Sequence, residues 1–570
     1  MKLLTEILSD LFMDAFAACG YEASLGTVVA SARPELCQFQ CNGALAGAKQ
    51  YKKSPMQIAN EVLQEVKGQD RFKAVEIAAP GFLNITLTDD FLMQYVEEVY
   101  ADRHLGVPQA TTPKTIVLDY GNPNVAKPLH VGHLRSAVIG EALKRIASAV
   151  GHHTIGDVHL GDWGLPMGLV LAELEERYGN ELPTLTTELL NEIYPFASKK
   201  SKENAEFLEK ARSMTALLQK GDDTCRATWK KMIALSVADI RATFDRLGAT
   251  FDYWYGESNS SPYVPELLEI LKSKELLTES EGAQVVEVAM EGDKNPLPPT
   301  IILKSNGSEG YATTDVATVL QRQKDFAPDA IWYVVDFRQN LHFTQVFRTA
   351  RRAGLVPEST ALTHLCFGTV NGTDGKPFKT RDGGVMQLSE LLNAVVERAY
   401  EKLRLPEGTA EAEKQKTAEA IGIAAIKFGD LINHYSKDCI FDLEKFMASE
   451  GKTGVYLLYV IARIHSILKK SEKIPTHLCH VYTESERELL LRLALSGGAF
   501  LAAYREKSPN LLCENAYQLA VAFSRFYHEN HILSEENEEK RATRLALCVI
   551  TKAILQKQLD ALGIPTVESM

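Results

Sequence analysis

The chain has 570 residues, of which 45% are hydrophobic and 24% charged, and its formal net charge is −12. This composition excludes an intrinsically disordered chain. The length is sufficient for about three or four domains. The acidic balance argues against general nucleic-acid binding, although a local basic face on an acidic protein is sufficient for it.

Cysteine usage and hydropathy indicate the compartment. Nine scattered cysteines, with only Cys37 and Cys41 close together, favour reduced thiols, and we expect no zinc or other metal site. Glu6, Asp10 and Asp14 interrupt the apolar start of the chain, so we expect no signal peptide. No stretch approaches the ~18 apolar residues of a membrane span. We therefore expect a soluble, cytoplasmic protein with no membrane partner.

Residues 1–110 predict a small α+β domain. Apolar residues at helical spacing predict helices over about 2–18 and 53–67. Two short strands are predicted within 73–87, joined at a Pro-Gly turn. The Pro- and Thr-rich segment 106–114 is typical of a linker.

Residues 115–165 predict a strand, a loop, a long helix over 131–151 and a second strand, which is the opening of a doubly wound, Rossmann-like parallel sheet. The resulting α/β domain is expected over 115–404, with an inserted helical region at about 168–280. Further strands are predicted at 300–304, 331–336 and 364–370, alternating with helices at about 315–326, 340–354 and 387–404.

From residue 405 to 570 the pattern predicts an all-α bundle without strands. Residues 454–470 place an apolar stripe on one helical face. A last helix at about 540–562 ends before Gly563 and Pro565.

The motif HVGH occupies residues 130–133, where the predicted loop passes into the long helix. A helix start presents free N–H groups and a partial positive charge, which suits a nucleotide phosphate. His130 and His133 share one helical face, and Gly132 allows close approach of a nucleotide to the backbone. Taken alone, two surface histidines are the common alternative.

A second cationic motif, KPFKTRDGG, follows at 376–384. Its lysines, Lys376 and Lys379, stand between glycine-containing turns. Such a loop can close on a triphosphate and neutralise the charge that develops as pyrophosphate leaves. A solvated charged turn is the alternative for this motif alone, and the pairing of the two motifs on one chain favours the nucleotide site.

Longer segments around both motifs resemble the arginyl-tRNA synthetases, a family of class I aminoacyl-tRNA synthetases, and the resemblance covers nearly the whole chain. The matching segments are NPNVAKPLHVGHLRS (122–136), HLGDWGLPMG (159–168), FDYWYGES (251–258), YATTD (311–315), VVDFRQNLHF (334–343), FGTVNGTDGKPFKTRDGG (367–384), GKTGVYLLYVIARIHSIL (451–468), LDALGIPTVESM (559–570), QFQCNGALAGAK (38–49) and PGFLNI (80–85).

The resemblance implies ATP-dependent ligation of L-arginine to tRNA(Arg) through an arginyl-adenylate, with Mg²⁺ accompanying ATP and transfer to the 2′-hydroxyl of the terminal adenosine. His130, Gly132, His133 and Lys379 would bind ATP, and Lys376 would assist. Lys127 is an upstream lysine that is thought to replace Lys379 in some arginyl enzymes. Because both are present here, their division of labour is open. The catalytic set is His130, His133, Lys376, Lys379 and Lys127.

An arginine pocket needs a carboxylate opposed edge-on to the planar guanidinium. Tyr311 and Asp315 are four residues apart, and Asp315 would accept the guanidinium and reject lysine; a first-turn helix acid is the alternative. Glu257 is a second candidate carboxylate. By resemblance, the remaining pocket residues are Asn122, Asn124, His133 and Gln339.

RNA contacts are predicted at both ends of the chain. Near the N-terminus, Phe39, Gln40 and Asn42 resemble the stretch that contacts the tRNA D-loop in this family. In the helical bundle, aromatic and cationic side chains suit splayed anticodon bases, with helix packing as the alternative. These residues are Tyr456, Tyr459, Arg463 and Arg525. We expect a monomer that does not bind DNA.

Two other function classes compete with this interpretation. Another HxGH nucleotidyl-transfer enzyme would not need a long helical C-terminal part, and a cysteinyl enzyme would need zinc ligands that the sequence lacks. A non-catalytic RNA-binding relative is expected to have lost the motif histidines and lysines, which are retained here.

Overall fold

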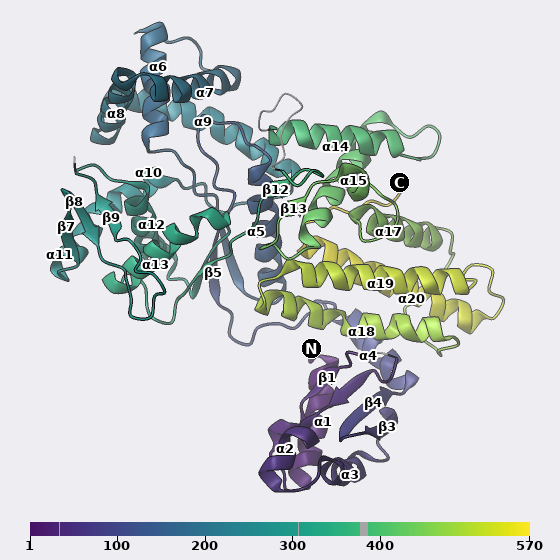
Figure 1. Ribbon diagram of the computed structural model, residues 1–570. Coiled ribbons are helices and arrows are strands. Elements are labelled where there is room, and N and C mark those ends of the chain that lie inside the picture. Colours follow the sequence, from purple (N-terminus) through teal and green to yellow (C-terminus); the bar gives the residue numbers. More distant parts are fainter. Residues whose placement is uncertain (34, 180, 306, 377–385) are drawn as a thin grey trace.

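The computed structural model describes residues 1–33, 35–179, 181–305, 307–376 and 386–570. These residues form an N-terminal domain, a central parallel sheet with a helical insertion and a small second sheet, and a C-terminal helical body (Figure 1). The α/β fold with an α+β N-terminal domain and an all-α C-terminal part is the one that the sequence predicts.

The N-terminal domain is built on an antiparallel sheet in the order β1-β2-β4-β3. Both predicted helices and the hairpin formed by β3 and β4 are confirmed, whereas the other five elements were not predicted. The elements are α1 (Leu4–Ala18), η1 (Ala23–Gly26), β1 (Val28–Ala30), β2 (Phe39–Cys41), α2 (Gly43–Tyr51), α3 (Pro55–Val66), β3 (Phe72–Ala78), β4 (Phe82–Leu87) and α4 (Asp89–Ala101).

The central sheet is parallel, in the order β11-β10-β5-β6. Its strands are short apolar runs, as expected where helices cover both faces. The elements are β5 (Thr115–Asp119), α5 (Gly132–Ala149), β6 (His153–Asp157), α12 (Tyr311–Phe326), β10 (Ala330–Tyr333), η3 (Phe337–Gln339), α13 (Asn340–Ala353), β11 (Ala361–His364) and α14 (Leu388–Lys402).

Alternate residues of β5 enter different cores. Ile116 and Leu118 belong to the large core that includes α5 and the C-terminal helices. Val117 belongs to a second core with α12 and α13. After β5 the chain goes to β6 on one side, and later to β10 on the other side, so the strand order reverses between β5 and β10. Ligands of doubly wound sheets bind at the carboxyl ends of the strands at such a switch point.

Residues 165–303 separate β6 from α12 and form the helical insertion and a three-stranded antiparallel sheet, β7-β8-β9. The strand predicted at 300–304 is present as β9, but it belongs to this separate sheet. Its residues alternate between exposed Ile301 and buried Ile302, whereas the central strands are largely buried. The elements are α6 (Leu165–Tyr178), α7 (Thr187–Glu203), α8 (Ala205–Lys220), α9 (Asp223–Arg246), α10 (Glu257–Ser260), η2 (Ser261–Tyr263), α11 (Val264–Ser273), β7 (Leu277–Ser280), β8 (Ala283–Val286) and β9 (Thr300–Leu303).

The predicted strand at 364–370 is displaced. β11 ends at His364, and the next strand, β12 (Val370–Asn371), pairs in parallel with β13 (Cys439–Ile440). The prediction of no strand beyond residue 405 is therefore wrong at β13, because two paired residues carry no detectable periodic pattern. This pairing joins the segment before KPFKTRDGG to the chain that follows α15.

The C-terminal helices include α17, whose apolar residues Leu457, Ile461 and Ile464 are buried as predicted, and α20, which confirms the last predicted helix. Arg487 of α18 attaches the N-terminal domain, donating to Asp89 Oδ1 at 2.6 Å and to the carbonyl of Leu87 at 2.7 Å. The elements are α15 (Glu411–Leu431), α16 (Leu443–Phe446), α17 (Gly454–Lys469), α18 (Glu484–Arg505), α19 (Pro509–Glu529) and α20 (Glu538–Ala561).

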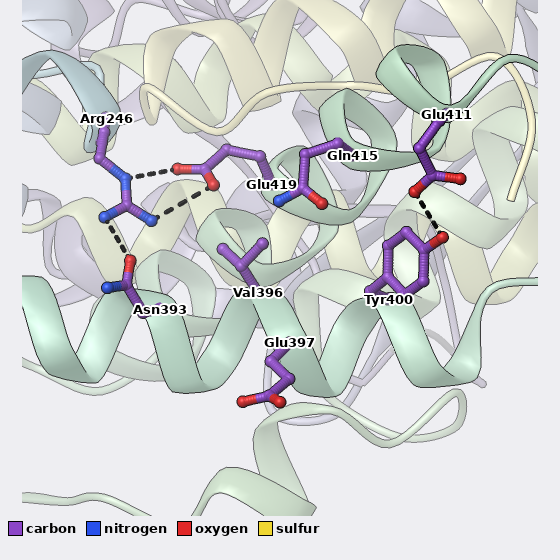
Figure 2. A pocket seen from close by; sticks show the side chains of 8 residues that line it. All are labelled: Arg246, Asn393, Val396, Glu397, Tyr400, Glu411, Gln415 and Glu419. Atoms are coloured by element: carbon purple, nitrogen blue, oxygen red, sulfur yellow. Dashed lines mark hydrogen bonds and ion pairs between the residues drawn. The ribbon is translucent and has the colours of Figure 1, made fainter.

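Arg246, the last residue of α9, ties the helical insertion to α14 and α15. Its guanidinium donates to both carboxylate oxygens of Glu419, at 2.8 and 3.3 Å, and to Asn393 Oδ1 at 2.9 Å (Figure 2). A groove of about 520 Å³ lies beside this bridge, lined mainly by acidic and polar side chains. The insertion is thus anchored to the C-terminal side of the molecule as well as to the sheet.

Candidate active site

Backbone hydrogen bonds bring the two motifs together. Leu388 N donates to the carbonyl of Leu129 at 2.9 Å, and Val131 N donates to the carbonyl of Met386 at 3.2 Å. His130 forms an antiparallel bridge with Gln387. Residues 386–388, which come just after KPFKTRDGG, therefore lie directly against HVGH. Lys376 is described and exposed, whereas Lys379 lies outside the described residues.

The HVGH histidines form a compact pair at the start of α5. Their ring centroids are 4.0 Å apart. Gly132 N donates to Nδ1 of His130 at 3.0 Å, and His130 N donates to Nδ1 of His133 at 3.1 Å. Since Nδ1 of His130 accepts, its neutral ring carries the proton on Nε2 and supplies an N–H donor suited to a phosphate oxygen. Nδ1 of His133 also lies 3.3 Å from the carbonyl oxygen of His130, so this ring fits either tautomer.

These histidines are neutral near pH 7. Burial, together with the charges of Lys127 and Arg338, lowers the pKa of His130 to about 4. Burial and the neighbouring His130 lower the pKa of His133 to about 3. Arg338, which the sequence analysis did not single out, forms a bidentate pair with Asp336, both N···O distances being 2.8 Å. Lys127 and Arg338 therefore place positive charge near His130, which favours binding of a polyphosphate.

Gly132 has a steric role at this helix start. A Cβ at this position would lie 2.7 Å from Cε1 and 2.8 Å from Nδ1 of His130. Contacts under 3.0 Å force a shift, so the ring of His130 can lie over the first turn of α5 only because residue 132 has no side chain. Gly132 is predicted from the sequence to allow close approach of the nucleotide, and the fold adds this second requirement.

A cavity of about 720 Å³ lies beside the switch point. Three of the residues predicted to bind arginine line it, namely Asn124, Glu257 and Tyr311. They come from the loop after β5, the start of α10 and the start of α12. Glu257 is brought here because the segment before it runs alongside the chain after β6, with Leu160 bridged to Gly256.

Asp315 lies one turn after Tyr311 on α12, and two histidines hold its carboxylate. Nε2 of His342 is 2.5 Å from Oδ2, and Nε2 of His159 is 3.4 Å from Oδ1. Burial alone would raise the pKa of Asp315, but these two partners hold it well below its usual value. Burial and the charge of Asp315 raise the pKa of Glu257 to about 7. At neutral pH Asp315 is therefore ionised, and Glu257 is about half-ionised.

Asn122 is oriented by a buried charge cluster under the sheet edge. Its Nδ2 donates to Oδ1 of Asp119 at 2.5 Å. Nη2 of Arg322 on α12 donates to Oδ2 of Asp119 at 2.6 Å and to Oδ2 of Asp157 at 2.7 Å. Arg322 thereby joins the ends of β5 and β6 to α12. Gln339, at the end of η3, is exposed near this edge.

Comparison with known proteins decides the family. The family description "tRNA synthetases class I (R), catalytic domain" matches residues 95–443. The chain belongs to the arginyl-tRNA synthetase family. The "Arginyl tRNA synthetase N terminal domain" matches residues 2–87, and the "DALR anticodon binding domain" matches residues 457–570.

Relatives of arginyl-tRNA synthetase type match along the whole chain. The arginine–tRNA ligase of Agathobacter rectalis is 45% identical and that of Alkaliphilus oremlandii 44%, each covering 100% of both chains. Among solved structures, arginyl-tRNA synthetases of Plasmodium falciparum and Thermus thermophilus share the fold. Their TM-scores are 0.84 and 0.80, at 24% and 22% identity, again over 100% of both chains.

The N-terminal residues predicted to contact tRNA differ in accessibility. Phe39 is fully buried in the core of the arginyl-tRNA synthetase N-terminal domain, so it cannot present its ring to RNA. Strand alternation explains this correction, because β2 turns Phe39 and Cys41 inward. Gln40 is half-buried and donates to Asn84 at 2.8 Å, and Asn42 is exposed.

On the DALR helices, the predicted aromatic residues fall into two groups. Tyr456 is half-buried and shares a 2.8 Å hydrogen bond with Ser524. Tyr459 and Tyr527 are exposed, and the guanidinium of Arg463 lies over both rings, 4.4 and 4.7 Å from the centroids. Arg525 is paired with Glu488 and Glu529 at 2.7 and 2.9 Å. Because Tyr527 comes from α19, the Tyr459–Arg463–Tyr527 stack joins two helices.

Within the described ranges, no group of three or more His, Cys, Asp or Glu side chains is arranged to hold a metal ion. In the same part of the chain, no helix has the length and hydropathy needed to cross a membrane.

Proposed function

We propose that this chain ligates L-arginine to tRNA(Arg) in two steps that consume ATP. The observation that carries the proposal is the position of the cavity lined by Asn124, Glu257 and Tyr311. It lies at the switch point of the central sheet, where the loop after β5 leads from Asn124 directly to the paired histidines of HVGH. Asn124, which we assign to the amino-acid substrate, and the histidines that we assign to the polyphosphate thus lie on one short segment, as a reaction between the two substrates requires.

In the first step, an arginine carboxylate oxygen attacks the α-phosphorus of ATP and the bond to the pyrophosphate oxygen breaks. The nucleophile is already ionised at neutral pH, so catalysis rests on alignment and electrostatic stabilisation rather than on a general base. Asp315 and Glu257 hold the guanidinium. Asn122, Asn124, His133 and Gln339 hold the α-amino and carboxylate ends.

The leaving pyrophosphate gains charge as the bond breaks. The Nε2–H groups of His130 and His133 donate to phosphate oxygens, and donors that strengthen as charge develops lower the barrier. Lys127 adds positive charge near His130, and we assign Lys376 and Lys379 the same role on the loop side. Mg²⁺ bound with ATP would supply further positive charge to the phosphates, and we assign no residue of this chain as its ligand.

In the second step, the 2′-hydroxyl of the terminal adenosine attacks the arginyl carbonyl, forms the ester and releases AMP with loss of the hydroxyl proton. We assign tRNA contacts to Gln40 and Asn42 in the N-terminal domain. On the C-terminal helices we assign them to Tyr456, Tyr459, Arg463 and Arg525. We propose a cytoplasmic monomer.

Arginine-dependent exchange of pyrophosphate into ATP, measured with and without bulk tRNA, tests the proposal. Exchange with arginine but not with lysine supports the substrate and the site together. Lack of exchange with any amino acid, even with tRNA present, contradicts the enzymatic function and favours a non-catalytic RNA-binding role.

A further inference from the structure

His159 stands beside the arginine cleft without a role in the reaction described above. It follows β6 by two residues, and its backbone is fixed on both sides. Val158 N donates to the carbonyl of Tyr253 at 3.2 Å, and Leu160 N donates to the carbonyl of Tyr255 at 2.8 Å. The residue adopts a left-handed φ of 43°, which a non-glycine side chain rarely tolerates. The chain therefore holds this imidazole in one place at a conformational cost.

The imidazole is nearly enclosed, since its side chain is 11% exposed, and it faces carboxylates. Among the described residues neither ring nitrogen has a hydrogen-bond partner, although Nε2 lies 3.4 Å from Oδ1 of Asp315. The other oxygen of Asp315 is held by His342 at 2.5 Å. Asp315 is thus flanked by a histidine at each oxygen.

The groups that act electrostatically on His159 are mostly acidic. They are Asp119 at the end of β5, Asp162 after β6, Glu257 of α10, Asp315 and Arg322 of α12, and His342 acting through Asp315. Burial alone would lower the pKa of His159, but the pairing with Asp315 and the charge of Asp119 raise it to about 9. His159 therefore carries a positive charge at neutral pH.

We propose that His159 is a positioning residue for arginine recognition, which as an imidazolium fixes Oδ1 of Asp315 while His342 fixes Oδ2. Each carboxylate oxygen keeps a second lone pair, and a carboxylate anchored at both oxygens presents those lone pairs in one fixed plane. A planar guanidinium fork gains from that geometry, whereas the point charge of a lysine ammonium does not. This proposal rests on the proposed function, because it concerns the same substrate site.

The test compares wild-type protein with His159→Asn and with a matched control, His152→Asn. His152 lies in the turn before β6, and its Nδ1 accepts from Lys114 N at 3.1 Å. It is not one of the two histidines that contact Asp315. Steady-state arginylation gives KM for arginine, KM for ATP and kcat. For His159→Asn we expect KM for arginine to rise about tenfold or more, as loss of a charge-assisted contact implies, with KM for ATP unchanged. His152→Asn should match the wild type.

A pH series of arginine binding by calorimetry, from pH 7 to 10, separates positioning from packing. Wild-type affinity should fall as pH rises through about 9, where His159 loses its proton. His159→Asn should lack that component. The α-amino group of arginine titrates equally in both proteins, so the difference between the two curves reports His159.

Parallel pH curves, an unchanged KM for arginine, or equal loss of ATP and arginine affinity would each overturn the proposal. Failure of the proposed function is distinguishable, because the wild-type protein itself would then neither bind arginine nor exchange pyrophosphate.

Discussion

Arg135 and Asp430, which are 295 residues apart in the chain, form a buried ion pair with 2.8 Å between Nε and Oδ1. Nη1 of Arg135 also donates to the carbonyls of Gly368 and Lys437, both at 2.8 Å. Arg135 follows HVGH on α5, Gly368 precedes β12, and Asp430 belongs to α15. One guanidinium therefore connects the first motif, the approach to the second motif and the C-terminal helices.

Removing Asp430 should strongly destabilise this junction. Asp430→Ala leaves the guanidinium of Arg135 buried and uncompensated, so the free energy of unfolding should fall by about 3–5 kcal/mol. Denaturant unfolding followed by circular dichroism measures the change. The control is Glu514→Ala, which breaks an exposed pair with Lys452 and should cost about 1 kcal/mol or less. Equal effects of the two variants would contradict the role of the buried pair.

Gly132→Ala should impair catalysis without impairing folding. The new Cβ would meet the ring of His130 at 2.7 Å and displace it, and a displacement near 1 Å costs about 10²-fold in rate. Alanine is the better helix former, so the melting temperature should not fall. The control is Gly498→Ala on α18, where the nearest atom to a new Cβ is 3.9 Å away. Normal kcat in Gly132→Ala would refute the steric requirement.

His133→Ala removes one neutral donor to the phosphates, so kcat should fall about 10²–10³-fold. Single-turnover formation of the adenylate measures the effect directly. Because the pKa values of His130 and His133 lie at about 4 and 3, neither titrates between pH 6 and 8.5, and the remaining activity should keep the wild-type pH dependence. His153→Ala, at an exposed position at the start of β6, serves as the control.

Arginine affinity should weaken as pH falls below about 7. The pKa of Glu257 is raised to about 7, so its carboxylate gains a proton below that pH and no longer opposes the guanidinium with a charge. The dissociation constant should rise about tenfold for each pH unit below that pKa if binding requires the ionised form. Calorimetry from pH 5.5 to 8 in two buffers should show proton release on binding near pH 7. Glu257→Gln should flatten the pH profile, and an unaltered slope would rule out this assignment.

Tyr459→Ala should weaken tRNA binding selectively. The exposed ring stacks with Arg463, and loss of one stacking platform costs about 1–3 kcal/mol, so KM for tRNA should rise at least fivefold. KM for ATP and for arginine should not change, since both sites are on the central sheet. A rise in all three constants would instead indicate a folding defect.

The sequence predicted the elements whose signals are local. The strand at 115–119, the helix after HVGH and the stripe of Leu457, Ile461 and Ile464 follow from hydrophobic periodicity, and the structure contains all of them. The switch point depends on the order of the strands in the sheet, which the sequence pattern does not give. Tyr311 and Asp315 could be placed together because both belong to one helix.

The features that the sequence did not predict depend on contacts between residues far apart in the chain. His159 and His342 meet at Asp315 from separate segments, and no spacing rule links them. The inward orientation of Phe39 depends on β2, a three-residue strand too short for a periodic signal. The partner strand of β9 could not be inferred either, since an apolar run of four residues does not reveal its neighbours.

The pairing of β12 with β13 bears on how the protein can be dissected. Val370 and Asn371, which precede the second motif, pair with Cys439 and Ile440. Asp438 Oδ1 also accepts from Thr369 N at 2.8 Å. A recombinant fragment that stops after α14 would lose that support as well as Asp430. A truncated catalytic unit built for screening or crystallisation should therefore extend at least through residue 441.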